Sequence, residues 1–284
     1  MPKKTAKDEM DALLFIDTNI LLDFYRDRKS DISIKFLEQI EACKDRLILG
    51  SQIEMEYKKN RQHVILESLG KFGSPDWGKL SAPALVSETQ AAAMIKKHQI
   101  ELIKQQRILT AKIQNILENP ARYDEVYKVL QRVFKHDSAF NLHRDDKRRF
   151  SIRRLARKRF FLGYPPRKRD DTSYCDAINW EWMVQCALDS GKDIVVVTRD
   201  SDYGAIYKDR SYLNDWLLQE FKQRVSQRRK IKLTASLSEG LKIVHAKVTK
   251  EMEEEERRMI NEMLAGLGLL DYIENEKAGM DAGG

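Results

Sequence analysis

Two short apolar runs that end in acidic residues constrain this chain more than any other feature. Leu13–Ile16 is apolar without a break and leads directly into Asp17, while Ile194–Val197 leads three residues later to Asp200. Apolar runs without alternation are typical of strands buried on both faces, as in parallel sheets. Because the carboxyl ends of parallel strands share one edge, where ligand crevices form, we expect both acids on one rim of an α/β fold.

Two further acids, Glu56 and Asp176, lie near the starts of predicted helices. Glu56 follows the predicted strand 46–50 and a helix start at Ser51, and Asp176 opens a later helix that ends before Gly191. Asp17 by itself is equally compatible with a simple helix cap, because a helical pattern begins directly after it. Four acids in comparable positions make a shared site the stronger hypothesis.

Length and composition indicate a globular protein without a membrane span. The 284 residues suit one large domain or one domain with an insertion, and neither a membrane-length apolar run nor a signal-peptide core is present. We therefore expect a cytoplasmic protein. The three cysteines form no CxxC pair, which indicates reduced structural thiols, and the five histidines form no close helical pair. Any metal is accordingly expected to be bound by oxygen.

Positive charge is concentrated in one segment. The formal net charge is +7, but residues 144–169 alone contain twelve Lys or Arg against two Asp, so the remaining chain is slightly acidic. Such a run is often only a solvated face. Because this one adjoins the proposed acidic site, we expect it to contact phosphates of a nucleic acid. The candidates are Arg149, Arg153, Arg154, Arg157, Arg167, Lys168 and Arg169.

The middle of the chain predicts a helical insertion. Gly and Pro residues in 71–83 mark a boundary, and Ile95, Leu102, Leu109 and Ile116 then repeat every seven residues. We favour a helical hairpin whose return helix, through 126–134, buries this stripe; a two-chain coiled coil is the alternative. The basic helix that follows is expected to turn Phe150, Leu155 and Phe160 inward.

The predicted domain organisation is discontinuous. Residues 11–75 and 160–240 form the α/β domain, 84–160 the helical insertion, 236–270 a C-terminal helix and 271–284 a disordered tail. A helix is expected to begin at Ser211, a last strand at 230–234, and the acidic run 251–256 is expected to be solvated surface.

Four segments together resemble the PIN-domain nucleases. They are FIDTNILLD at 15–23, SQIEMEYKKNR at 51–61, FLGYPPRKRDDTSYCDAINWEW at 161–182, and VVVTRDSD at 195–202. Their order matches the family, and the long helical segment is similar to a PIN-like subfamily with an insertion. The resemblance implies a three-layer fold with a central, mainly parallel sheet flanked by helices, to which the helical-hairpin insertion is added.

The resemblance also assigns roles to residues. It implies that Asp17, Glu56, Asp176 and Asp200 are the metal-binding catalytic acids, with Asp202 a fifth ligand and Asn19 and Thr198 supporting polar residues. Glu54 competes with Glu56, because residues two apart point to opposite sides of a helix; the family pattern favours Glu56 since Tyr57 follows it. Repulsion among the acids predicts one or two Mg²⁺ or Mn²⁺ ions.

The function expected from these features is metal-dependent hydrolysis of a nucleic-acid backbone. The resemblance implies an endoribonuclease that leaves a 3′-hydroxyl and a 5′-phosphate, with RNA preferred over DNA as substrate. Two alternatives stay open: a non-cleaving PIN-like nucleic-acid-binding or scaffold module, and a DNA structure-specific nuclease. The insertion and the C-terminal helix are the candidate surfaces for a homo-oligomer or a partner protein. Toxicity, RNA processing and phage defence are all roles that such a nuclease could have.

Overall fold

The chain divides into two compact units. The computed structural model describes residues 10–26, 30–72, 82–167, 173–207 and 210–266. One unit comprises the chain up to Arg61 and from Val129 onward, and the other comprises Gln62–Lys128. The predicted insertion of 84–160 thus differs from the observed smaller unit, because residues 129–160 belong to the larger one.

The larger unit is built on a five-stranded parallel sheet. Its order is β3-β2-β1-β4-β7, and every neighbouring pair is parallel. The central pair runs in register from Ala12 opposite Asp193 to Ile16 opposite Val197. Both central strands are buried along their whole length, as their unbroken apolar sequences predict. The bounds are β1 Ala12–Ile16, β2 Leu47–Gly50, β3 Asn141–Leu142, β4 Asp193–Val197 and β7 Ile231–Thr234.

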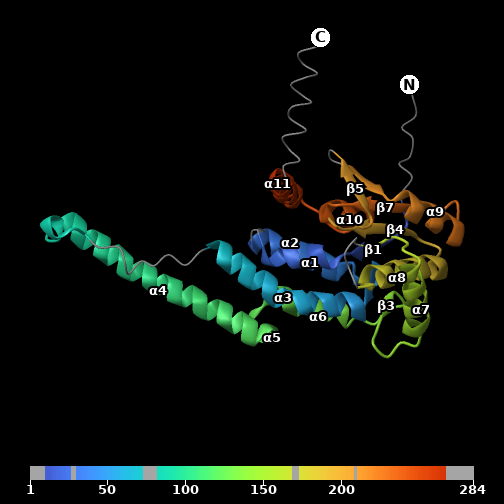
Figure 1. Ribbon diagram of the computed structural model, residues 1–284, viewed down its shortest axis with the longest axis horizontal. Coiled ribbons are helices and arrows are strands. Elements are labelled where there is room, and N and C mark those ends of the chain that lie inside the picture. The colour runs from blue at the N-terminus through green and yellow to red at the C-terminus, as the bar shows by residue number, and fades with distance from the viewer. Residues whose placement is uncertain (1–9, 27–29, 73–81, 168–172, 208–209, 267–284) are drawn as a thin grey trace, which may run out of the picture. The chain divides into compact units, whose positions relative to one another are not determined.

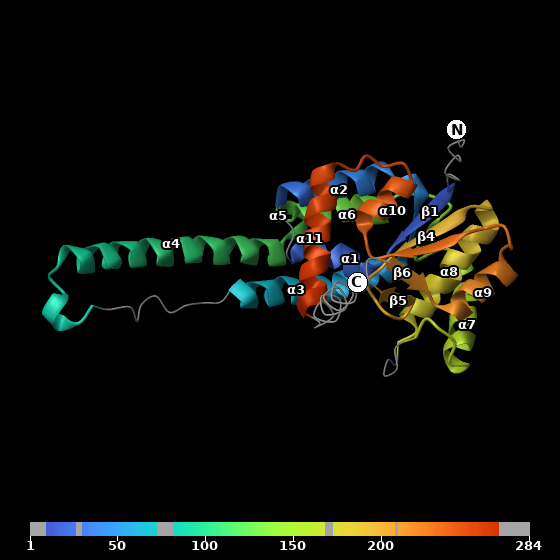
Figure 2. The same cartoon turned by 90° about the horizontal axis from the view of Figure 1, so that it is seen from above.

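Helices cover both faces of this sheet, which confirms the predicted three-layer α/β fold. Helices α2, α10 and α11 lie on one side, and α7, α8 and α9 lie on the other (Figures 1 and 2). Helix α10 approaches the sheet so closely that a Cβ at Gly240 would lie 2.5 Å from Cγ2 of Val197. Gly191 ends α8 in the left-handed conformation, as predicted for its C-cap.

The helix bounds place the sequence motifs. The α-helices of the larger unit are α1 Thr18–Leu22, α2 Ser30–Ala42, α3 Ser51–Phe72 (which continues into the smaller unit), α6 Glu125–Phe134 (shared likewise), α7 Arg148–Phe161, α8 Cys175–Ser190, α9 Asp215–Arg224, α10 Leu237–Ile243 and α11 Lys250–Gly266. Short 3₁₀ turns are η1 Asp23–Tyr25, η2 Lys44–Arg46 and η4 Ala84–Val86. No helix among the described residues is both long and apolar enough to span a membrane.

Three short strands were not predicted from the sequence. The two-residue strand β3 lies within the segment that was expected to be wholly helical. Strands β5 (Gly204–Tyr207) and β6 (Arg210–Leu213) form an antiparallel hairpin with alternating exposure. The helix expected from Ser211 therefore begins only at Asp215, where Asn214 caps it by accepting a hydrogen bond from the Trp216 N–H. These strands are too short to produce a recognisable pattern.

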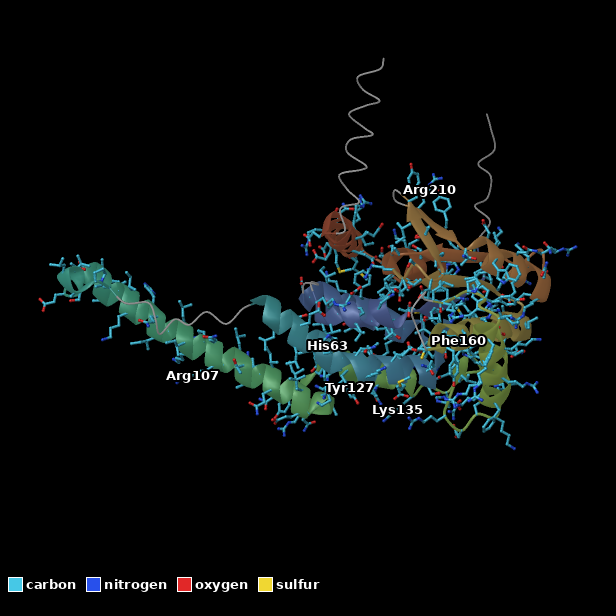
Figure 3. All side chains as sticks on the ribbon, viewed as in Figure 1. His63, Arg107, Tyr127, Lys135, Phe160 and Arg210 are labelled. Carbon is cyan, nitrogen blue, oxygen red and sulfur yellow. The ribbon has the colours of Figure 1, made fainter. Side chains whose placement is uncertain are left out.

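The smaller unit contains the long helix. Helix α4 spans Gln90–Glu118 and the single turn α5 spans Pro120–Tyr123, with Asn119 and Pro120 at the break as predicted. Side chains project from α4 along its length, including Arg107 (Figure 3). Ile95, Leu102 and Leu109 are exposed. The expected return helix instead buries Leu130, Val133 and Phe134 in the larger unit, where the Phe134 ring packs on Tyr57.

The C-terminal region also differs from its prediction. The single helix expected over 236–270 is two helices, α10 and α11, separated by residues 244–249 in which His245 has a positive φ. The acidic run is not wholly solvated, since Glu255 and Glu256 are buried. The tail of 271–284 lies outside the described residues.

Candidate active site

Asp17 occupies the C-terminal edge of the sheet. Its N–H donates to the carbonyl oxygen of Val197 on the adjacent strand at 2.9 Å, which extends the β1–β4 pairing by one residue. Its side chain also caps α1, because Oδ1 accepts the Thr18 N–H at 2.6 Å. The carboxyl group is only 4% exposed. Asp17 is thus both the helix cap and the central acid of the rim. The two interpretations offered by the sequence, a simple cap and a site acid, therefore apply to the same residue.

The two predicted supporting residues contact Asp17 directly. Thr198 Oγ1 donates to Oδ2 of Asp17 at 2.6 Å, and Asn19 Nδ2 donates to the same oxygen at 3.2 Å and to Thr198 Oγ1 at 3.0 Å. The Asp200 N–H donates to Thr198 Oγ1 at 3.0 Å. One threonine hydroxyl therefore links the ends of β1 and β4 and fixes the backbone position of Asp200.

Burial and neighbouring acids raise the pKa of Asp17. Loss of solvation raises the pKa of Asp17 to about 7, and the carboxylates of Asp200 and Glu56 add to this effect. Hydrogen bonds from Thr198 and Thr18 oppose the rise without cancelling it. A carboxyl group whose pKa is about 7 and that lies beside other carboxylates ionises more readily when a cation approaches.

This perturbation predicts how stability depends on pH. The folded-state pKa of Asp17 lies above its unfolded value, so its destabilising effect is absent below about pH 4, grows as the pH rises from about 4 to about 7, and is constant above that. In EDTA, wild-type protein is expected to lose on the order of 2 kcal/mol of unfolding free energy relative to Asp17→Asn between pH 5 and pH 8. Urea unfolding of both proteins at the two pH values measures this difference. A constant difference would show that Asp17 ionises normally.

Glu56, rather than Glu54, faces the site. Thr18 Oγ1 donates to Oε2 of Glu56 at 3.2 Å, and Gln52 Nε2 donates to its Oε1 at 2.8 Å. Glu54 points elsewhere and pairs with Lys58 at 2.6 Å. The two residues lie on opposite sides of α3, as their spacing requires.

Tyr203 is a buried residue close to the acids of the site. Its side chain is fully buried, and its hydroxyl donates weakly to the carbonyl oxygen of Asp176 at 3.5 Å. Burial raises the pKa of Tyr203 well above its usual value, and the charges of Asp176, Asp17, Glu56 and Asp202 raise it further. Four acids from four separate sequence segments therefore lie close enough to this phenol to influence its ionisation. No sequence pattern indicates this role, because the tyrosine lies in a polar turn.

Cys175 is a second contact that the sequence did not predict. Its Sγ accepts hydrogen bonds from Gln52 Nε2 at 2.9 Å and from Ser173 Oγ at 2.7 Å. Burial, reinforced by the charges of Glu56 and Asp176, raises the pKa of this thiol to about 12. The thiol therefore stays protonated and helps position Gln52 rather than acting as a nucleophile.

Arg199 ties the Asp200 loop to the C-terminal helices. This buried guanidinium forms ion pairs with Asp23 and, at 3.6 Å, with Glu256 Oε1. Glu256 is 1% exposed and accepts the N–H groups of Leu237 and Ser238, each at 2.7 Å, at the start of α10. A residue of the supposed surface run thus supports the loop that carries Asp200.

The basic candidates separate into different environments. Arg154, Arg157 and Arg167 are exposed, Arg149 and Arg153 are half-buried, and Lys168 and Arg169 lie outside the described residues. The orientation predicted for α7 is wrong for Phe150 and Leu155, which are 76% and 37% exposed, because Ile152, Ala156 and Arg159 form the buried face of this helix. Phe160 is half-buried, with the Arg167 guanidinium 4.4 Å from its ring centroid.

Arg159, within the same basic segment, is structural. It pairs with Glu181 at 2.9 Å and with Glu220, and Arg224 pairs with both acids. Removal of one partner would leave an uncompensated buried charge. Arg159→Met is therefore expected to lower the unfolding free energy by about 3–5 kcal/mol. Urea denaturation should show that the exposed control Arg154→Met changes the unfolding free energy by at most about 0.5 kcal/mol. Equal losses of unfolding free energy in the two variants would contradict the buried network.

The donor atoms at the rim fit a hard divalent cation. They are carboxylate and amide oxygens, and Asn19 Oδ1 is buried without a hydrogen-bond partner in the described part of the chain. Within the same residues, no three His, Cys, Asp or Glu side chains are already arranged as a metal-binding group. The fit therefore rests on donor chemistry, on the orphaned amide oxygen and on the raised pKa of Asp17.

Comparison with known protein families matches residues 14–203 to the PIN domain. This chain belongs to the PIN-domain family. The match begins within β1 and ends at Tyr203, so it contains all five predicted site acids, Asp17, Glu56, Asp176, Asp200 and Asp202. PIN domains are generally nucleases, typically with divalent metals at the site. Comparisons with curated proteins and with solved structures give no match.

Proposed function

We propose that this PIN-domain protein is a divalent-metal-dependent endoribonuclease. The observation that supports it best is the convergence at one sheet edge of Asp17, whose pKa is raised to about 7, with Glu56 and Asp200. Clustering of carboxylates destabilises a fold, so such a cluster is typical of a functional site. The assignment of RNA as substrate rests on the resemblance to the family.

The proposed ligands are the rim acids. Asp17, Glu56, Asp176, Asp200 and Asp202 would hold one or two Mg²⁺ or Mn²⁺ ions. A bound ion supplies a water of lowered pKa and neutralises charge on the phosphodiester. Thr198 and Asn19 keep the Asp17 carboxylate oriented, and Gln52 and Thr18 do the same for Glu56. Hydrolysis is expected to leave a 3′-hydroxyl and a 5′-phosphate.

Helix α7 offers a surface for single-stranded substrate. Its exposed side chains combine Arg154 and Arg157 with Phe150 and Phe161. Guanidinium groups bind phosphates, and exposed aromatic rings stack on unpaired bases. The combination favours single-stranded RNA over duplex. Arg167 is proposed to contact phosphates as well, and so are Lys168 and Arg169, which lie outside the described residues.

Cleavage assays decide between this proposal and the other two functions. Labelled single-stranded RNA, duplex DNA and branched flap DNA are incubated with purified protein in Mg²⁺, Mn²⁺ or EDTA. Metal-dependent cutting of RNA that yields 5′-phosphate ends is the expected result. Preferential cutting of flap DNA would indicate a structure-specific nuclease, and RNA binding without cutting would indicate a non-cleaving module.

Association with other chains belongs to the same proposal. A homo-oligomer or a partner protein would bind through the exposed apolar residues of α4 or through α11. Light scattering of the purified protein is expected to show a mass above 33.2 kDa if α4 pairs with a second copy. A monomer would leave only the partner-protein alternative.

A further inference from the structure

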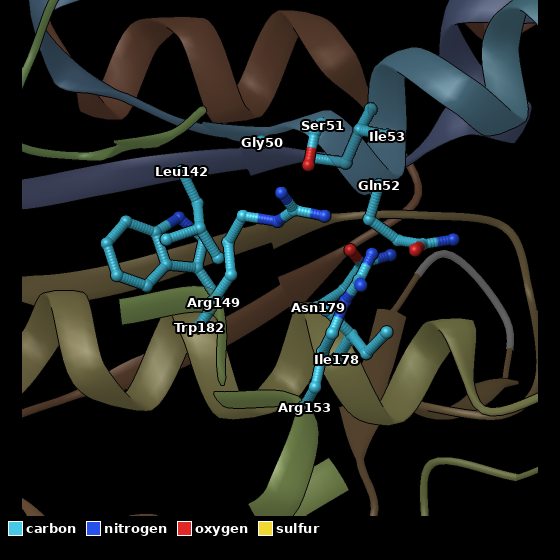
Figure 4. Close-up of a pocket in the computed structure, with 10 residues that line it drawn as sticks. All are labelled: Gly50, Ser51, Gln52, Ile53, Leu142, Arg149, Arg153, Ile178, Asn179 and Trp182. Carbon is cyan, nitrogen blue, oxygen red and sulfur yellow. The ribbon is translucent and has the colours of Figure 1, made fainter. Parts of the chain in front are cut away.

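A recess outside the acid cluster gathers positive charge at the start of α3. Its polar lining consists of Ser51, Gln52, Arg149, Arg153 and Asn179, and Trp182 forms part of an apolar wall. In Figure 4 the guanidinium groups of Arg149 and Arg153 extend from α7 toward the first turn of α3. The lining contains no carboxylate that would neutralise them.

Arg149 carries a buried donor, Nε, that has no hydrogen-bond partner among the described residues. Burial lowers the pKa of Arg149, the neighbouring charges of Arg153 and Arg144 lower it further, and the charges of Asp145 and Asp146 partly oppose this change. Positive charges held together against their repulsion favour an anion between them.

Asn179 supplies an independent sign of a ligand. Its side chain is 3% exposed, and its Nδ2 donor has no partner in the described residues. A buried donor that is left unsatisfied costs about 1–3 kcal/mol, so it normally faces a bound group or an ordered water. Asn179 follows Asp176 by three positions on α8, which places both residues on one side of that helix.

The first turn of α3 completes the recess. This helix is 22 residues long and begins at Ser51, directly after the end of β2. The N–H groups of a helix's first turn lack intrahelical partners, and the helix dipole adds partial positive charge there. Two guanidinium groups, an amide donor, a hydroxyl and a helix N-terminus together match the tetrahedral array of phosphate oxygens.

Gln52 connects this recess to the acids. It lines the recess, and its Nε2 donates to Glu56 Oε1 at 2.8 Å. We propose that the recess binds one backbone phosphate of the nucleic acid, next to the phosphodiester at the acid cluster. This inference rests on the proposed nuclease function only for the identity of its ligand as substrate. The subsite would set the position of the strand without reading its sequence.

The test measures RNA binding in EDTA, where no cleavage is required. Fluorescence anisotropy compares wild-type protein with Arg149→Gln/Arg153→Gln and with Lys35→Gln/Lys242→Gln. The control pair removes the same charge from α2 and α10 on the other side of the sheet, where each lysine forms a surface ion pair. We expect the arginine pair to weaken binding about tenfold or more and to reduce the salt slope by one to two. Equal effects of both pairs would overturn the subsite.

A second variant keeps the test valid if the arginine pair folds poorly. Asn179→Asp preserves the side-chain volume and places a carboxylate in the lining of the recess that also contains the two arginines. It is expected to weaken RNA binding at least as strongly as the arginine pair while thermal stability is unchanged or higher. Unaltered RNA affinity in a folded Asn179→Asp protein would contradict the proposal.

Two further arms identify the phosphate and separate this inference from the nuclease proposal. If the arginine pair loses the same affinity for 5′-hydroxyl RNA as for 5′-phosphorylated RNA, the recess binds a backbone phosphate. A loss of affinity for 5′-phosphorylated RNA alone would overturn the backbone-phosphate proposal in favour of a terminal phosphate. With metal added, the arginine pair is expected to raise KM and leave kcat unchanged. Wild-type protein that never cleaves but shows arginine-dependent binding would refute the nuclease and retain the subsite.

Discussion

Asp17→Asn is expected to reduce RNA cleavage at least about a thousandfold while the protein stays folded. The substitution is nearly isosteric, so the Asn oxygen can still accept the Thr18 N–H in place of Oδ1, whereas the amide NH2 takes the place of Oδ2 beside the Thr198 hydroxyl. The negative charge at the centre of the rim is lost. Loss of a central electrostatic contact in an active site typically lowers kcat by about 10²–10³, and loss of a metal ligand lowers it further. Single-turnover kinetics with labelled RNA measures the effect.

Thermal unfolding supplies the control for Asp17→Asn. Because burial already raises the pKa of Asp17 to about 7, removing its charge should not destabilise the metal-free protein at pH 8. An inactive variant with an unchanged or higher Tm supports a direct role. Full activity in Asp17→Asn would contradict the site.

Glu56→Gln is expected to lower cleavage about a hundredfold or more, whereas Glu54→Gln should leave it within about twofold of wild type. The two residues belong to one helix and differ only in direction. Glu56 accepts hydrogen bonds from Thr18 and Gln52 beside Asp17, whereas Glu54 pairs with Lys58. Both substitutions remove one negative charge from α3. A difference in cleavage between the two variants therefore reflects the position of Glu56 in the site and not the change in net charge.

Metal titration of the same two variants extends this comparison. Glu56→Gln is expected to need more Mn²⁺ for half-maximal activity, and Glu54→Gln the same amount as wild type. Loss of activity in Glu54→Gln with Glu56→Gln unaffected would reverse the assignment of the two glutamates.

The central sheet and its acidic edge could be predicted from the sequence for a simple physical reason. Strands buried on both faces must be continuously apolar, so Leu13–Ile16 and Ile194–Val197 are visible without a structure. Their parallel register then carries Asp17 and Thr198 to adjacent positions. Asn19 was correctly placed beside Asp17 by the resemblance to the family.

The contacts that were not predicted depend on tertiary packing. Tyr203 and Arg199 gain their positions from residues distant in sequence, and no local pattern marks a buried phenol or guanidinium in a polar turn. Glu256 resembles its exposed neighbours in composition and differs only because α11 turns it toward α10. Phe150 was predicted to be inward because it is apolar, whereas Ile152 and Ala156 fill that face of α7.

Direct measurement of Mn²⁺ binding tests the central claim most directly. Electron paramagnetic resonance of free Mn²⁺ at pH 8 reports how many ions the protein removes from solution, independently of any substrate. We predict one or two ions bound by wild type and by Glu54→Gln, and greatly weakened binding by Asp17→Asn. Absence of binding to wild-type protein at millimolar Mn²⁺, or equal binding by all three proteins, would contradict a metal centre at this edge of the sheet.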